Sequence, residues 1–268
     1  MMTQLKRLLT YFLVVVISVW VLAPLVLITV SAFAVPEDYY DRSRLLPLRY
    51  TIDNVSVFML VLGAWRTTLN SLVVAGVTIA LSFLMGLPAG YSIARFVFPG
   101  RDSFKLAVIG LRMFPGLVLA VPLTSIYLRV GLADTLLGIA LAHTTMALPF
   151  VVLITSSVFA GVPVELEEAG LVFGLSRLES FLRITLPLSL PGLSATAMFV
   201  FIMSWNEVFI ASVLSLVNRT LPADILVSAL AAPDPLKFAA SFIIVVPALI
   251  FVLVARRYLV QIWGITVR

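Results

Sequence analysis

The chain has 268 residues, of which 62% are hydrophobic and only 12% are charged. Soluble domains are usually about half apolar and about a quarter charged, so most of this chain is expected to lie in a lipid bilayer. No cysteine and one histidine are present, which excludes disulfides and thiolate metal sites and leaves almost no imidazole for a metal. The net charge of +5 comes from basic residues scattered between apolar runs, so nucleic acid is not an expected partner.

Six apolar runs are long enough to be membrane spans, because crossing about 30 Å of hydrocarbon takes roughly 20 helical residues. In chain order the predicted spans are residues 8–36, 67–94, 106–128, 136–162, 188–217 and 238–255. A signal peptide is the alternative for the first run, but its apolar region would be about 7 to 15 residues long. The sequence therefore predicts an all-α integral membrane protein with one domain, residues 1–268, and no soluble domain.

The basic residues between the spans predict the orientation. An even number of spans places both termini on one side of the membrane, together with the loops at 95–105 and 163–187. That side carries Lys6, Arg7, Arg95, Arg101, Lys105, Arg177, Arg183, Arg256, Arg257 and Arg268. The other side carries fewer: Arg42, Arg44, Arg49, Arg66, Arg129, Arg219 and Lys237. Basic residues near span ends favour the cytoplasm, so both termini are predicted to be cytoplasmic.

The loop of residues 163–187 carries signals for two short helices. Pro163 is suited to the start of a helix, and the acidic residues that follow complement the positive end of the helix dipole. Gly174 permits a left-handed helix end. Ser176 and Glu179 have the spacing of a capping box for a second helix. The sequence thus predicts two amphipathic helices joined by a glycine elbow at the cytoplasmic membrane surface.

One face of the first predicted helix is suited to a groove on a partner protein. It carries Leu166, Ala169, Gly170 and Phe173, at helical spacing. The same loop resembles the EAA loop of binding-protein-dependent ABC importer permeases. The match consists of Glu168-Ala169, a glycine six residues after the Glu at Gly174, and then, nine residues further on, Ile184, Leu186 and Pro187.

Two positions depart from the family pattern. Gly170 stands where the family usually has a second alanine, and Phe173 stands where an aspartate often precedes the glycine. Gly170 is expected to weaken the helix by up to about 1 kcal/mol relative to alanine. The resemblance implies that the loop couples the chain to an ATPase through Glu165, Glu167, Glu168, Ala169, Gly170, Gly174, Ile184, Leu186 and Pro187.

Other stretches resemble the carbohydrate type of these permeases, in particular the smaller permease chain of maltose-type importers. Residues 89–101 are similar to the family's "AYALAR-x-x-FPGR", and Trp205-Asn206-Glu207 is similar to its "WNEF" element. The C-terminal tail, residues 261–268, lacks the glycine-rich basic ending of that type.

This resemblance implies a subunit of a sugar or oligosaccharide importer, which is not itself an enzyme and has no cofactor or catalytic residue of its own. The implied partners are a second permease chain, an ABC ATPase dimer that holds ATP and Mg, and an extracytoplasmic solute-binding protein. Importers of phosphodiesters, polyamines or phosphate share the EAA spacing and stay as alternatives. An ion-coupled secondary transporter is disfavoured, because it would be expected to have several intramembrane carboxylates or inverted repeats.

A few polar residues lie within the predicted spans. Trp205, Asn206 and Glu207 are candidates for the translocation path, because a carboxylate at membrane depth is expected to face the bundle or a partner and not lipid. In a continuous fifth helix, Asn206 and Glu207 would point about 100° apart. His143 is expected to pack or form a hydrogen bond inside the bundle, and Arg112 is a weaker path candidate.

Overall fold

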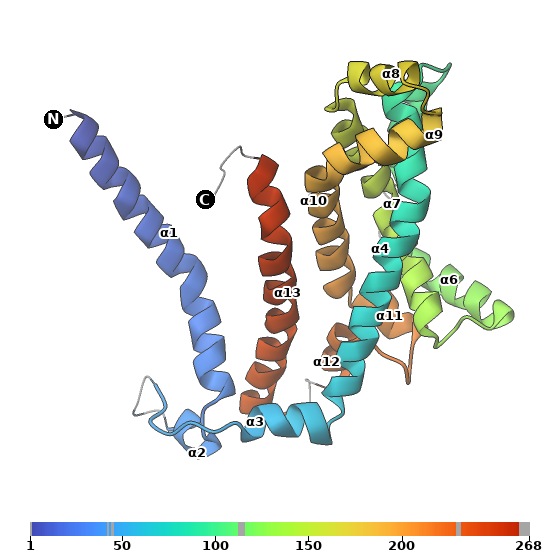
Figure 1. Ribbon diagram of the computed structural model, residues 1–268. Helices are drawn as coiled ribbons and strands as arrows, with labels where there is room; N and C mark the ends of the chain where they lie inside the picture. Colours follow the sequence, from blue (N-terminus) through green and yellow to red (C-terminus); the bar gives the residue numbers. More distant parts are fainter. Residues whose placement is uncertain (1, 42, 44–45, 112–115, 229–231, 263–268) are drawn as a thin grey trace. The chain divides into compact units, whose positions relative to one another are not determined.

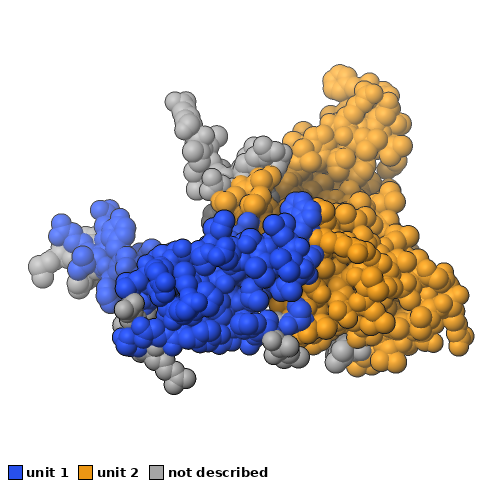
Figure 2. Space-filling view, turned by 90° about the horizontal axis from the view of Figure 1, so that it is seen from below, with its two compact units in different colours: residues 1–65, 228–246 blue, residues 66–227, 247–268 orange. Residues whose placement is uncertain are grey.

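The computed structural model describes residues 2–41, 43, 46–111, 116–228 and 232–262, with the backbone alone for 2, 3, 5, 117, 119 and 255–262. These residues form helices and no strand, and one isolated antiparallel bridge joins Ala34 and Tyr50. The chain divides into two compact units, drawn in blue and orange in Figure 2. Unit 1 contains residues 1–65 and 228–246, and unit 2 contains residues 66–227 and 247–268. The last helix contributes residues to both units, so this division does not decide how many domains the chain has. The single membrane domain therefore stays a prediction.

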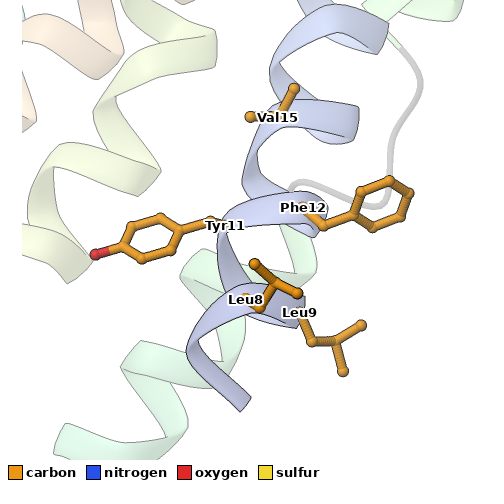
Figure 3. A pocket seen from close by; sticks show the side chains of 5 residues that line it. All are labelled: Leu8, Leu9, Tyr11, Phe12 and Val15. Atoms are coloured by element: carbon orange, nitrogen blue, oxygen red, sulfur yellow. The ribbon is translucent and has the colours of Figure 1, made fainter. Parts of the chain in front are cut away.

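Unit 1 contains α1 (Met2–Ala32), α2 (Pro36–Tyr39), α3 (Asp53–Ser56), the π-helical turn η1 (Val57–Val61) and the first part of α13 (Asp234–Ile262). Residues 6–24 of α1 are all exposed. Figure 3 shows five of their side chains projecting outward around a hollow on the helix surface. A helix that is apolar and exposed on all sides is expected to lie against lipid or another protein.

The loop after α1 is held by one carboxylate. Asp38 accepts hydrogen bonds from the backbone N–H groups of Leu48, at 3.1 Å, and Arg49, at 2.8 Å. The Arg49 guanidinium completes the site, with Nη2 2.7 Å from Asp38 Oδ1. The hydrogen bonds from the Arg49 side chain and backbone hold the pKa of Asp38 at about 2.

Unit 2 contains the longest run of consecutive helices. These are α4 (Ala64–Arg95), α5 (Arg101–Gly110), α6 (Gly116–Val130), α7 (Leu136–Ala160), α8 (Val164–Val172), α9 (Arg177–Ser180), α10 (Leu186–Trp205), α11 (Phe209–Leu214) and α12 (Leu221–Ser228). A π-helical turn, η3 (Phe181–Thr185), joins α9 to α10. Helix α7 carries much of the core and packs mainly against α10. Figure 1 shows α8 and α9 at one end of α4 and α7, and α11 and α12 toward the other.

The predicted all-α membrane fold is confirmed. Five helical segments are long and apolar enough to cross a membrane: Lys6–Ala32, Ala64–Arg95, Leu136–Ala160, Arg177–Trp205 and Asp234–Val254. They correspond to five of the six predicted spans. The first ends at Ala32 rather than at residue 36, because Pro36 opens the new helix α2.

The third predicted span, residues 106–128, is not one helix in the structure. Helix α5 ends at Gly110 and α6 begins at Gly116, and residues 112–115 between them lie outside the described residues. Glycine is a weak helix former, so a helix end at each of these two positions is physically reasonable.

The helical segment at the fifth predicted span, residues 188–217, has different bounds from the span. The helical segment begins at Arg177 and includes the wide turn η3, and Pro187 follows this turn in the first turn of α10, where a proline is tolerated. It ends at Trp205, and the chain forms a second short helix, α11, after a break at residues 206–208.

Candidate coupling loop and membrane break

The glycine elbow predicted between two short helices is confirmed. Helix α8 ends at Val172, and Gly174 has a φ of +89°, in the left-handed region. The N–H of Leu175 donates to the Gly170 carbonyl and the N–H of Gly174 donates to the Leu171 carbonyl, both at 3.0 Å. These two bonds form a Schellman helix end. A Cβ on Gly174 would have no heavy atom within 4 Å among the described residues. Within this chain, glycine is therefore favoured here by its left-handed backbone conformation and not by lack of space.

The start of the second helix also follows the prediction. The Ser176 hydroxyl accepts a hydrogen bond from the Glu179 N–H at 3.3 Å, and Glu179 Oε2 accepts one from the Ser176 N–H at 2.9 Å. This reciprocal pair is the capping box. The elbow and the cap together fix the angle at which α9 leaves α8.

The predicted docking face of α8 is only partly present. Gly170 is buried, and a Cβ at this position would lie 2.7 Å from Cδ1 of Ile184. Gly170 and Ile184 therefore pack the loop against its own return segment, which is a correction to the prediction that Gly170 faces a partner. Leu166 and Ala169 stay on the exposed side.

The exposed apolar surface of the loop extends beyond the predicted face. Phe173 is 87% exposed and Val172 is 85% exposed, and both lie directly before the elbow. Leu178, on α9, is 66% exposed. We call Val172, Phe173 and Leu178 the elbow patch. Glu165, Glu168 and Pro187 are also exposed, and Leu186 is half-buried.

Glu167 faces inward, unlike its neighbour Glu168. Its carboxylate lies 2.6 Å from Nη2 of Arg95, the last residue of α4, and the two side chains are only 9% and 10% exposed. Tyr91, also on α4, donates to Glu167 Oε2 at 2.7 Å, and Thr185 donates to Oε1 at 2.6 Å. Arg95 also donates to the Val162 carbonyl, at 2.9 Å. The Glu167 cluster thus connects α4, the end of α7, α8 and η3.

The charge of Glu167 is compensated despite its burial. Burial raises the pKa of Glu167, and the hydrogen bonds from Thr185, Tyr91 and Arg95 outweigh that effect, so the pKa lies below its ordinary value. Sequence reasoning assigned Glu167 to the docking surface with Glu168. The sequence held one signal of the inward orientation of Glu167. Glu167 lies three residues before Gly170, so both lie on the same face of α8.

Glu207 lies at the break between α10 and α11 and not on a continuous helix. Its two carboxylate oxygens accept hydrogen bonds from the N–H groups of Ile210, at 2.9 Å, and Ala211, at 3.0 Å. The carboxylate therefore caps the first turn of α11. His143 Nε2 of α7 lies 3.3 Å from Glu207 Oε2, and His143 Nδ1 lies 2.8 Å from the Ser204 hydroxyl. The expectation that His143 forms a hydrogen bond inside the bundle is confirmed.

The other two candidate path residues point to different surroundings. Trp205 is 1% exposed and stacks on Phe201 with ring centroids 5.6 Å apart, and Phe201 stacks on Phe251. Asn206 is exposed and donates to the Ile202 carbonyl at 3.0 Å. The predicted 100° separation on one helix is wrong, because α10 has already ended at Trp205. Arg112 lies outside the described residues, as does the tail from residue 263.

The opposite end of unit 2 is tied together by Asp134. Its carboxylate accepts hydrogen bonds from the Ser215 hydroxyl and from the N–H groups of Val217, at 3.1 Å, and Asn218, at 2.9 Å. Asn218 also accepts a hydrogen bond from Arg66 at 2.9 Å. These contacts join the loop before α7 to the loop after α11. Among the described residues, no group of three His, Asp or Glu side chains is placed to hold a metal ion.

Residues 86–262 match the family model described as the binding-protein-dependent transport system inner membrane component. The chain is 30% identical to the trehalose transport system permease protein SugB of Mycobacterium tuberculosis, over 84% of this chain and 84% of SugB. It is 34% identical to the alpha-glucoside transport system permease protein AglG of Rhizobium meliloti, over 80% of this chain and 59% of AglG. It is 32% identical to the inner membrane ABC transporter permease protein YcjP of Escherichia coli, over 80% of this chain and 79% of YcjP.

Solved structures show the same fold. A chain of a bacterial ABC transporter involved in the import of the acidic polysaccharide alginate superimposes with a TM-score of 0.77 at 17% identity, over 95% of this chain and 96% of that chain. A chain of the MetNI methionine ABC transporter superimposes with a TM-score of 0.61 at 19% identity, over 76% of this chain and 96% of that chain.

Proposed function

Because the chain belongs to the family of binding-protein-dependent transport system inner membrane components, we propose that it is a membrane-spanning subunit of an ABC importer for a sugar or oligosaccharide. The family places it in the inner membrane as a multi-pass protein. The sugar assignment is supported by relatives named for trehalose and alpha-glucoside transport. The observation that carries the proposal is the geometry of the coupling loop, an exposed apolar elbow on a rigid base.

The elbow patch is the part that docks on an ATPase subunit. Three large apolar side chains exposed to water are costly unless a partner covers them, and a short helix that presents such side chains fits a groove. ATP and Mg are held by that partner, and a second permease chain and an extracytoplasmic solute-binding protein complete the importer. This chain itself carries no catalytic residue and no cofactor.

The Glu167 cluster makes the loop move together with the membrane helices. A docked loop shifts the membrane helices only if its contacts with the ATPase differ between the states of the ATPase. If the loop were loosely attached, it would move without moving the helices. Arg95 and Tyr91 fix α8 to the end of α4, so displacement of the elbow displaces α4 as well.

The loop faces the cytoplasm in this proposal, with both termini on the same side. The excess of basic residues in that group of loops supports the orientation. Reporter fusions after Asp102 and after Asn218 test it. The first should report a cytoplasmic position and the second an external one, and the reverse result would overturn the orientation.

The translocation path includes the break at residues 206–208. Discontinuous membrane helices expose backbone groups that are tolerated where they line a cavity, and Asn206 is the exposed polar side chain at this break. Trp205 and Glu207 support the break from inside, and Asn206 is the residue placed to face the solute.

The proposal is tested by coexpression of the chain with the ATPase, second permease and solute-binding protein encoded nearest to it, followed by uptake of labelled trehalose, maltose and alpha-glucosides. ATP-dependent uptake of one of these sugars is the expected result. Phe173→Glu should abolish both uptake and copurification of the ATPase, because it places a charge in the docking groove. Leu216→Glu is the matched control, since Leu216 is 72% exposed but lies beyond α11. Equal ATPase recovery from both variants would overturn the docking assignment.

A further inference from the structure

A cavity of about 280 Å³ lies between the ends of α4 and α7 and the start of α5. Its polar lining consists of Arg101 and Lys105 from α5 and Ser156 and Ser157 from α7. Ile93, from the last turns of α4, contributes part of the apolar lining. All of these residues belong to unit 2. The cavity is separate from the elbow patch and from the break at residues 206–208.

The polar groups of this cavity favour an anion. Two cations and two hydroxyls line it, and no carboxylate does. The Ser156 hydroxyl donates to the Leu153 carbonyl at 2.8 Å, so Ser157 supplies the hydroxyl donor from α7. The nearest acidic partner on α5 is Asp102, whose side chain is 91% exposed and whose Oδ1 lies 3.5 Å from Lys105 Nζ. Arg101 also begins helix α5, where the helix dipole adds positive potential. Arginine and lysine together with hydroxyl donors are the groups that bind phosphate in proteins.

Arg101 supplies an independent sign of a missing acceptor. Within the described part of the chain, its Nε atom is buried and has no hydrogen-bond partner. Buried donors are nearly always satisfied, and an unpaired one is costly. A phosphate oxygen in the cavity would satisfy this donor.

The surroundings favour a phosphate that carries acyl chains. The cavity lies at the ends of α4 and α7, two helices long and apolar enough to span the membrane, which is where lipid headgroups lie. Next to it, α5 presents apolar side chains to the outside, with Leu106 69% exposed and Ile109 51% exposed. Basic pockets between membrane helices at the cytoplasmic surface bind anionic headgroups.

We propose that this cavity binds the phosphate group of an anionic phospholipid, with Arg101 and Lys105 as its cationic partners. Arg95, which holds Glu167, follows the α4 residue Ala94 that also lines the cavity. A bound lipid therefore braces the helix ends that carry the coupling loop. This site is independent of the transported solute.

The test counts lipid bound to the purified importer complex by native mass spectrometry. The complex is exchanged into detergent with phosphatidylcholine and titrated with phosphatidylglycerol. Wild type should retain phosphatidylglycerol in preference to phosphatidylcholine, and Arg101→Gln and Lys105→Gln should each weaken that retention about tenfold, the loss expected for one charged hydrogen bond. Lys6→Gln is the control, since it removes an exposed cation of α1 that does not line the cavity.

Two results would overturn the proposal. Equal retention of phosphatidylglycerol by wild type, Arg101→Gln and Lys105→Gln would show that the cavity is not the lipid site. If millimolar inorganic phosphate displaces the bound lipid and stabilises the complex as much as the lipid does, the cavity would be assigned to free phosphate. Because the readout is bound lipid and not uptake, neither result depends on the sugar assignment.

Discussion

The chain contains two buried glutamates whose partners are of different kinds. Glu167, in the coupling loop, is held by side chains from α4 and η3, so it connects segments that are distant in the sequence. Glu207, at the membrane break, is held mainly by the backbone of the helix that follows it and also contacts His143 on α7. The first carboxylate therefore stabilises tertiary structure, whereas the second stabilises a local helix start.

This difference shows that acidic residues in a recognised motif need not act at the motif's surface. Glu167 and Glu168 are neighbours, but Glu168 is exposed whereas Glu167 is buried. The motif therefore combines an exposed surface, which we propose docks on the ATPase, with the internal contacts that make this surface rigid. Substitutions that separate these two roles test the comparison.

The largest effect is expected for Glu167→Gln. It leaves the nearly buried guanidinium of Arg95 without its carboxylate, and loss of one partner from a buried pair costs about 3 to 5 kcal/mol. The midpoint of thermal unfolding of the purified complex should fall by several degrees, with loss of uptake. The double variant Glu167→Gln/Arg95→Met should recover much of the stability, and Glu165→Gln, at an exposed position of the same helix, should change it little. An unchanged midpoint for Glu167→Gln would contradict a structural role.

The second effect concerns the elbow. Gly174→Leu should abolish uptake, because a left-handed backbone costs about 1 to 2 kcal/mol for most residues and the helix end would rearrange. Gly174→Asn should retain much of the uptake, since asparagine tolerates this conformation. Uptake assays and ATPase copurification distinguish two causes. If asparagine is as damaging as leucine, the position is restricted by contact with the partner and not by backbone conformation.

A smaller effect is expected at the membrane break. Glu207→Ala removes the cap of α11 and should lower the free energy of unfolding by about 1 to 2 kcal/mol. Asn206→Ala should leave thermal stability nearly unchanged and alter the rate of sugar uptake, because Asn206 is exposed. If Asn206→Ala lowers stability while uptake per assembled complex is normal, the proposed path position of Asn206 is wrong.

The smallest effect is expected at Asp38, a third carboxylate with little exposed surface, which lies in the loop after α1 and outside the membrane-spanning helices. Since its pKa is held at about 2, below the ordinary 3.8, the ionised form orders the loop at higher pH, and this contribution is lost as pH falls through about 2. Hydrogen exchange should show protected N–H groups at Leu48 and Arg49 at pH 4, with severalfold weaker protection in Asp38→Asn. Asp41→Asn, which affects a local contact with Ser43, should leave both groups protected.

Local sequence signals predicted the loop well. The left-handed Gly174 and the Ser176 cap depend on residues a few positions apart, so their geometry could be derived without the rest of the fold. The inward orientation of Glu167 depends on Arg95, 72 residues earlier in the chain. The break after Trp205 lies at Asn206 and Glu207, two polar residues in an otherwise apolar run, and polar residues at that depth also fit a continuous helix that turns them toward the bundle. Long-range pairing thus decided the orientation of Glu167, whereas the break is stabilised by the local capping of α11 by the Glu207 carboxylate.

The close approach of Gly170 to Ile184 has a consequence for loop exchange between related permeases. A donor α8 with the alanine that the family usually has at this position would place its methyl carbon 2.7 Å from Cδ1 of Ile184, which would have to move. A graft of α8 alone therefore carries a steric mismatch into the recipient. A graft of the whole segment 163–187 brings both positions from one source, and its contacts with the recipient include the guanidinium at Arg95, the phenol at Tyr91 and the ring of Phe159. The smallest exchangeable unit is thus the complete loop with its return turn.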